Sequence, residues 1–181
     1  MTTSITLSTR ASVETAYAES VKASRALDVA CRADRARRNE GRSWSADLYE
    51  ARKAAEDADA QAFKALYSTQ QQARAEFLQG RPKGWEFAPQ RGDGQTLFTG
   101  KLLKQLPQAG LPPWADLPCV DHTEAIICDR QPVALVSHSY ASREEIEQYA
   151  TANHLNAEFL WWSWYYPGGC TAVLFTKGEA V

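Results

Sequence analysis

The sequence has few cysteines, and none of them form a close pair. Cys31, Cys119, Cys128 and Cys170 lie far apart, and no Cys-x-x-Cys motif is present. Small secreted domains that depend on disulfides have dense cysteines at short spacings. The pattern therefore excludes a disulfide-rich secreted scaffold and favours reduced thiols in the cytoplasm.

Long apolar runs are also missing. No stretch approaches the roughly 20 apolar residues that a membrane-spanning helix needs. The first ten residues lack the basic start and apolar core of a signal peptide. We therefore expect a cytoplasmic protein without a membrane partner.

No charge of one sign dominates, because 20 Lys and Arg stand against 22 Asp and Glu. Residues 81–181, which hold most of the aromatic side chains, carry 8 basic and 11 acidic residues. Aromatic platforms that stack nucleic-acid bases normally lie beside a positive groove. Nucleic acid is therefore not the expected partner.

Proline is absent from residues 1–80, whereas all eight prolines lie in residues 81–181. The change falls at Gly80-Arg81-Pro82, where a helix cannot continue. It predicts three regions: a helical hairpin over 1–80, a proline-rich irregular connection over 81–118, and a compact α+β domain over 119–181.

Alanines recur at helical spacing in the first region, from about 10 to 40 and again up to Gly80. Gly41 suits the end of the first helix, and Ser43 or Ser45 can cap the second. The short linker predicts an antiparallel, coiled-coil-like hairpin. Because its seam of small residues buries little area, the hairpin needs a further surface, either its own sheet or a second copy in a homodimer.

The last region alternates strand and helix signals. Ser142 and Glu145 form a capping box before a short helix, and Pro167-Gly168-Gly169 suits a tight reversal. The expected elements are strands 124–129 and 133–137, a helix over about 143–153, and strands 158–166 and 170–176. The fold class is therefore α+β, with a small antiparallel sheet (strand, strand, helix, strand, strand) and one helix on a face.

An aromatic run, residues 159–166, is the densest feature of the chain. In a strand, alternation would direct Phe159, Trp161 and Tyr165 to one face. It would direct Leu160, Trp162, Trp164 and Tyr166 to the other. Both faces would then be apolar and need cover, so the run is either core or a recognition surface, since Trp, Tyr and Arg anchor interfaces. The candidate binding residues are Trp161, Trp162, Trp164, Tyr165 and Tyr166.

A basic cluster extends from Arg32 to Arg42, and Arg35, Arg37 and Arg38 are its candidate binding residues. It could contact a phosphate backbone or an acidic protein. Alternatively, the arginines occupy a solvated helix end, where their charge suits the helix dipole.

Catalytic and metal signals are sparse. Cys170 follows two glycines, and His138 could activate its thiol as a base, with Asp121 or Asp129 orienting the imidazole. A small apolar core cysteine is the alternative. Cys119 and His122 are the only close pair of metal-ligand types, whereas zinc sites use four ligands. We therefore predict no metal site and no cofactor.

These observations favour a non-enzymatic protein-binding module. Small proteins of this type serve as inhibitors or adaptors, and a phage or mobile-element protein with an anti-CRISPR-like, anti-defence role fits the size. That last step rests on the class and not on particular residues. The alternatives are a cysteine-dependent enzyme that uses Cys170 and His138, and a nucleic-acid-binding protein that uses the arginine cluster.

Overall fold

The computed structural model describes residues 5–41, 45–89, 104–113, 117 and 120–178. The chain forms two compact units, Leu7–Ala73 and Met1–Thr6 with Arg74–Val181. The first unit is a helical hairpin, and the second holds an antiparallel sheet with a helix. The predicted α+β fold class with an N-terminal helical hairpin is therefore confirmed. Among the described helices, none combines the length and the hydropathy of a transmembrane segment.

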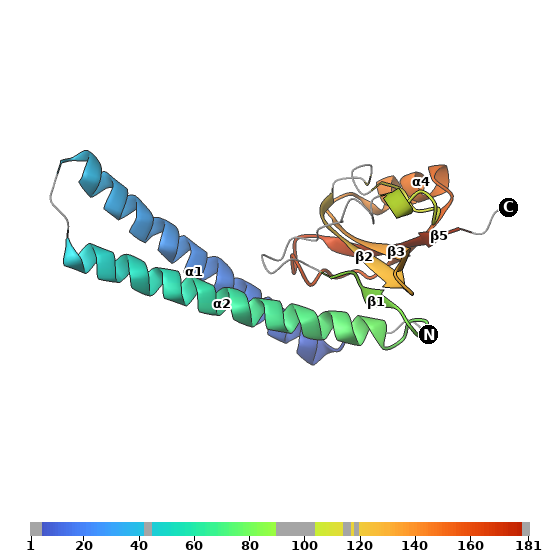
Figure 1. Cartoon of the computed structure of the whole chain (residues 1–181), viewed down its shortest axis with the longest axis horizontal. Coiled ribbons are helices and arrows are strands. Elements are labelled where there is room, and N and C mark those ends of the chain that lie inside the picture. The colour runs from blue at the N-terminus through green and yellow to red at the C-terminus, as the bar shows by residue number, and fades with distance from the viewer. Residues whose placement is uncertain (1–4, 42–44, 90–103, 114–116, 118–119, 179–181) are drawn as a thin grey trace. The chain divides into compact units, whose positions relative to one another are not determined.

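The hairpin consists of α1 (Leu7–Asn39) and α2 (Ala46–Leu78), which run antiparallel (Figure 1). Gly41 has a positive φ of 66°, which confirms its predicted position after the first helix. α2 ends two residues before Gly80, also as predicted. Of the two predicted caps, Ser43 lies outside the described residues, whereas the carbonyl of Ser45 accepts a hydrogen bond from the amide of Tyr49.

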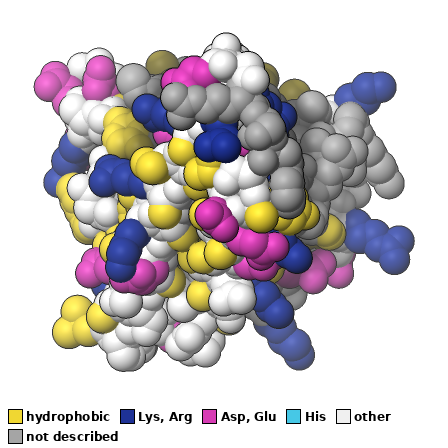
Figure 2. Space-filling model, turned by 90° about the vertical axis from the view of Figure 1, so that its left-hand side faces the viewer, with side chains coloured by type: hydrophobic (Ala, Val, Ile, Leu, Met, Phe, Trp, Pro, Cys, Tyr) yellow, Lys and Arg dark blue, Asp and Glu magenta, His cyan; other side chains and the backbone are white. Residues whose placement is uncertain are grey.

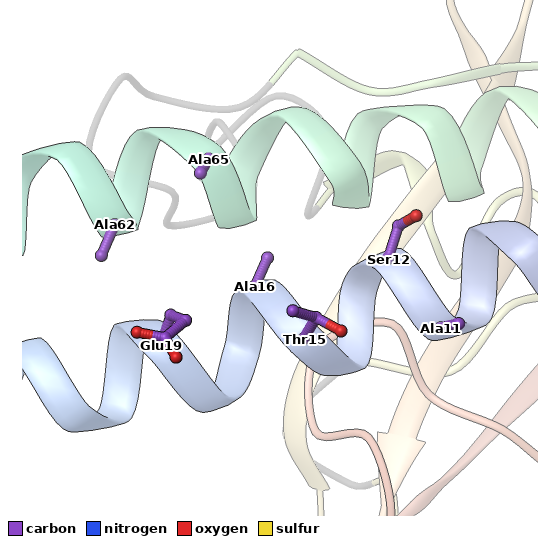
Figure 3. A pocket seen from close by; sticks show the side chains of 7 residues that line it. All are labelled: Ala11, Ser12, Thr15, Ala16, Glu19, Ala62 and Ala65. Carbon is purple, nitrogen blue, oxygen red and sulfur yellow. The ribbon is translucent and has the colours of Figure 1, made fainter.

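The seam between the helices is thin, because none of the described residues from 14 to 65 is buried. Polar contacts cross it instead: Ser24 donates to Asp59 at 2.6 Å, and Arg52 pairs with Asp34 at 2.9 Å. A groove of about 510 Å³ runs along the hairpin. Figure 3 shows Ala16 of α1 and Ala62 and Ala65 of α2 directed into the space between the helices. Such a groove is the expected result of alanines on both helices, and we assign no ligand to it.

The second unit contains a five-stranded antiparallel sheet in the order β1-β2-β3-β5-β4. Its strands are β1 (Glu86–Phe87), β2 (Val120–Cys128), β3 (Gln131–Ser139), β4 (Leu155–Phe159) and β5 (Thr171–Lys177). β1 lies within the region 81–118, which the sequence predicts as a proline-rich irregular connection.

Local sequence signals explain the turns and the helix cap that connect these elements. Asp129 and Arg130 have φ values of 48° and 65°, so β2 and β3 are joined by a two-residue turn of the primed type. α4 (Arg143–Ala152) begins with the predicted capping box of Ser142 and Glu145. Gly168, at the predicted reversal before β5, has a φ of 76°.

Both faces of the sheet are covered within this unit. On one face, α4 contributes Ile146 and Ala150 to a core with Leu135 and Phe175 (Figure 1). On the other face lie Phe77, from the last turns of α2, and Trp164, whose ring centroids are 5.7 Å apart. The division between the units therefore falls inside α2, whereas the predicted boundary at residue 80 stays a prediction.

The predicted strand over 158–166 is wrong beyond Phe159. Trp161 has a φ of 57°, a left-handed conformation that ends the strand. Side chains after that point do not alternate between the faces, because Trp162, Ser163 and Trp164 are all buried in succession. The aromatic run is thus a folded segment at the end of β4 and not a ribbon with two apolar faces.

Candidate functional site

A buried polar network lies on the sheet face opposite α4. It consists of Arg74 from α2, Glu124 from β2, His138 from β3, and Ser163, Trp164 and Tyr165 from the aromatic run. Antiparallel pairing of β2 with β3 places Glu124 close to His138, because these strands are hydrogen-bonded neighbours. Glu124, His138 and Ser163 are at most 1% exposed.

The hydrogen positions follow from the partners of each group. Glu124 Oε2 lies 3.2 Å from His138 Nε2 and accepts from Trp164 Nε1 at 2.8 Å. A carboxylate only accepts, so His138 carries its proton on Nε2. Ser163 Oγ accepts from the amides of Tyr165 and Tyr166 and therefore donates its proton to His138 Nδ1 at 2.8 Å.

Electrostatics support this protonation state. Burial lowers the pKa of His138 below its ordinary value, and the hydrogen bond to Glu124 offsets this only in part, so the imidazole is neutral at pH 7. Burial alone would raise the pKa of Glu124, but the hydrogen bond from His138 and the charge of Arg74 hold it below the usual value. Arg74 also hydrogen-bonds to the hydroxyl of Tyr165.

The order Ser163, His138, Glu124 resembles the hydrogen-bond chain of a nucleophilic serine, but its surroundings do not suit catalysis. A serine nucleophile needs a substrate carbonyl within reach of its oxygen, and Ser163 is 0% exposed. Its oxygen already accepts two backbone hydrogen bonds. The network therefore holds structure: it fixes the aromatic run onto the sheet.

Side chains of the run lie with Tyr140 and Arg143 in an exposed aromatic cluster, defined here as Tyr140, Arg143, Phe159, Trp161 and Tyr166. Trp161 is 63% exposed and stacks on Phe159, with ring centroids 5.1 Å apart. The Arg143 guanidinium lies 5.5 Å from the Trp161 ring centroid. Tyr140 is 54% exposed, and its ring centroid lies 6.1 Å from that of Tyr166.

Strand pairing places these residues at one end of the sheet. Ser139 at the end of β3 pairs with Thr171 at the start of β5. The amide of Leu160, just after β4, donates to the carbonyl of Ala172. Tyr140 and Trp161 therefore extend beyond the same sheet end, where α4 also begins. This end offers the Trp, Tyr and Arg side chains that dominate interfaces.

The structure thus divides the predicted aromatic binding residues into two groups. Trp162 and Trp164 are buried in the core, and half-buried Tyr165 packs against the ring of His122 at a tilt of 33°, with ring centroids 3.7 Å apart. Trp161 and Tyr166 belong to the exposed aromatic cluster. The run, for which the sequence left core and recognition surface as alternatives, thus supplies both buried and exposed side chains.

The proposed pair of Cys170 and His138 has no support from this geometry. Both ring nitrogens of His138 face other groups, Ser163 and Glu124. A base for the Cys170 thiol would need one of those nitrogens. Cys170 is half-buried at the turn before β5. Asp129 lies in the exposed turn between β2 and β3, and the side chain of Asp121 is outside the described residues.

The predicted arginine residues lie in the last turns of α1. Arg38 pairs with Asp34 and Arg32 pairs with Asp28, each along the same helix. On the face drawn in Figure 2, blue basic and magenta acidic side chains are interspersed. Local pairing thus offsets part of the positive charge that a phosphate backbone would need.

Sequence reasoning missed three residues of the buried polar network: Arg74, Glu124 and Ser163. A signal existed for Glu124, because it alternates with Ile126 in a strand that is apolar on both faces, and a buried carboxylate needs a partner. Arg74 likewise lies between Ala73 and Phe77 on the apolar side of α2. Nothing in the sequence near Ser163 indicates its contacts.

Within the described ranges, no group of three or more His, Cys, Asp or Glu side chains could hold a metal ion. Cys119 lies outside those ranges. Comparisons with protein-family models, with curated proteins and with solved structures found no match to this chain.

Proposed function

We propose that the protein is a non-enzymatic protein-binding module, an inhibitor or adaptor, whose contact surface is the exposed aromatic cluster. The observation that carries the proposal is Trp161, which is 63% exposed and has a left-handed backbone. For a bulky side chain that conformation costs about 1–2 kcal/mol. Strain of this kind persists where the surroundings impose it, and it concentrates at functional sites.

The surroundings of Trp161 are rigid on both sides. Before it, Leu160 is hydrogen-bonded to β5, and after it, Trp162 and Trp164 are buried. The buried polar network fixes Ser163 and Trp164 through His138 and Glu124. An anchor held in place before binding loses little conformational entropy when a partner arrives, which favours affinity.

A comparison of two alanine variants tests the proposal. Trp161→Ala removes the exposed indole, and Phe63→Ala removes a matched aromatic side chain that is 47% exposed on the hairpin. Each variant and the parent chain are used to isolate a stoichiometric protein partner from the cells that carry the protein, and the affinity is then measured by titration calorimetry. A hot-spot loss of about 2 kcal/mol corresponds to roughly a thirty-fold weaker Kd.

We expect that loss for Trp161→Ala and an unchanged affinity for Phe63→Ala. The reverse pattern would move the contact surface to the hairpin and contradict the proposal. Failure of the parent chain to retain any stoichiometric protein would contradict the function itself.

A further inference from the structure

β4 forms one edge of the sheet. β4 is the last strand in the sheet order, and no other described strand pairs with its outer side. The carbonyl of His154 accepts from the amide of Gly178, directly after β5, and the amide of Leu160 donates to the carbonyl of Ala172 on β5. In an antiparallel ladder the direction alternates, so residues 154, 156, 158 and 160 face β5. The amides and carbonyls of Leu155, Ala157 and Phe159 therefore face outward.

This edge lacks the features that usually protect a terminal strand. Natural edges carry proline, lysine or a bulge that discourages another strand from pairing. β4 reads Leu-Asn-Ala-Glu-Phe, and its one charge, Glu158, forms a two-pronged ion pair with Arg81 at 2.7 and 2.9 Å. An outward-facing row of donors and acceptors fits the backbone of an extended polypeptide.

The exposed aromatic cluster lies at the end of this edge. Phe159 is the last residue of β4, and Trp161 stacks on it. A strand that continued along β4 would therefore meet the indole and the Arg143 guanidinium, which lies 5.4 Å from the Phe159 ring. The backbone contacts and the aromatic anchor thus form one continuous surface.

Charge decides between a second copy and a different partner. α4 is the helix that contacts β4. Its Arg143 pairs with Glu147 at 2.6 Å, so the exposed Glu144 and Glu145 leave the helix with a net charge of −2. Two β4 strands paired about a two-fold axis would bring two α4 helices to the same face of the joined sheet. Their like charges would repel. A segment with basic residues would be attracted instead.

We propose that β4 is a docking edge for an extended, basic segment of a partner protein, which adds a sixth strand to the sheet and ends against Trp161. This inference rests on the proposed function and names the form of its partner. Backbone hydrogen bonds supply affinity, and the indole and the carboxylates of α4 supply selectivity.

Synthetic peptides and the full chain test the docking edge. The first probe is a peptide of about ten residues in which Thr and Val alternate, with two Lys at each end. The second probe has the same side chains and is made in two forms. Each form is N-methylated at alternate amides along one of the two edges of the peptide strand. The third replaces Lys with Glu. Amide hydrogen exchange of the protein is followed by NMR at Ala157 and Phe159, with Asn156 and Glu158, already paired with β5, as internal controls.

With the basic peptide we expect exchange at Ala157 and Phe159 to slow by about tenfold or more, with little change at Asn156 and Glu158. Methylation of the edge that faces β4 should abolish the effect, and the Glu peptide should bind more weakly at low salt. No slowing with the basic peptide at about 1 mM would overturn the proposal. So would equal binding of both N-methylated forms.

The variant Ala157→Pro removes one outward amide, a change that an edge strand tolerates. If Trp161→Ala weakens capture of the natural partner but Ala157→Pro does not, the docking edge is wrong and the proposed function stands. If neither variant weakens capture, both are wrong. If the parent chain forms a dimer and Ala157→Pro dissociates it, a second copy occupies the edge. That result would overturn the proposal of a basic partner segment.

Discussion

Trp161 places a large apolar side chain in solvent and holds its backbone at a φ of 57°. Comparison of Trp161→Gly with Trp161→Ala isolates the backbone contribution, because both variants remove the same indole. We expect the glycine variant to have a free energy of unfolding about 1 kcal/mol higher, since glycine has no Cβ to strain in the left-handed region. Urea denaturation measures this difference. An alanine variant as stable as the glycine variant would show that the position is unstrained.

His138 predicts an acid-sensitive stability. Burial lowers its pKa below the ordinary 6.5, so as pH falls the unfolded chain takes up a proton that the folded chain resists. The free energy of unfolding should therefore decrease as pH falls from about 7 through 5. Tryptophan fluorescence in urea at several pH values follows this change.

The control variant for this pH dependence is His138→Gln, which keeps a polar side chain and removes the titration. Its stability should be lower at pH 7 but should vary less between pH 7 and pH 5. A parent chain whose stability is constant over that range would contradict the neutral, buried imidazole. The pKa of Glu124 is also lowered, so its contribution to the free energy of unfolding is lost as the pH falls below the ordinary glutamate pKa of 4.5.

The contacts of the site residues were only partly predictable from the sequence. From its composition the aromatic run could be either core or a recognition surface; in the structure Trp161 is exposed and Tyr166 is half-buried. Trp162 and Trp164 are both buried because the backbone turns at Trp161. The alternation of side chains along a strand does not predict such a turn. Arg74, Glu124 and Ser163 meet only after folding, because they come from three distant segments of the chain.

At the scale of elements, the last turns of α2 supply the cation of the buried polar network on the sheet. Arg74 pairs with Glu124, and both side chains are at most 4% exposed. Arg74→Met leaves the buried carboxylate without its cation, so we expect a loss of about 3–5 kcal/mol in the free energy of unfolding. Chemical denaturation of the full chain measures it.

A matched change on the hairpin surface should have little effect. Arg32 pairs with Asp28 in an exposed ion pair along α1, with the arginine side chain 74% exposed. Exposed pairs of this kind contribute little to stability, so Arg32→Met should be close to neutral. Equal losses for the two variants would contradict the central place of Arg74.

Helices and turns were the best predicted elements, because their signals are local. The glycine after α1, the capping box of α4 and the reversal at Gly168 each act through one or two residues, and all three are confirmed. The predicted end of β4, residue 166, was wrong because the apolar pattern continues after the strand has ended at Phe159. The pairing order, which puts β5 between β3 and β4, is a long-range property of the sheet.

At the scale of the whole molecule, the two units differ in how much they bury. Between residues 14 and 65 no described residue is buried, whereas β3 contains a run of buried positions. Amide exchange in the middle of α1 and α2 should therefore be faster than in β3 by about a hundredfold or more. Mass-spectrometric exchange of the full chain measures both regions together. Comparable protection would mean that another surface covers the hairpin, as in a homodimer, one of the two alternatives that the sequence leaves open.

The central claim is that this protein acts through protein contact at the exposed aromatic cluster. The most direct measurement places a photo-crosslinking phenylalanine analogue at position 161, and in a control at position 63 on the hairpin, in cells that carry the protein. Position 161 should cross-link to one protein, through a basic segment of that partner, and position 63 should not. Cross-links at position 63 alone, or none at position 161, would contradict the account.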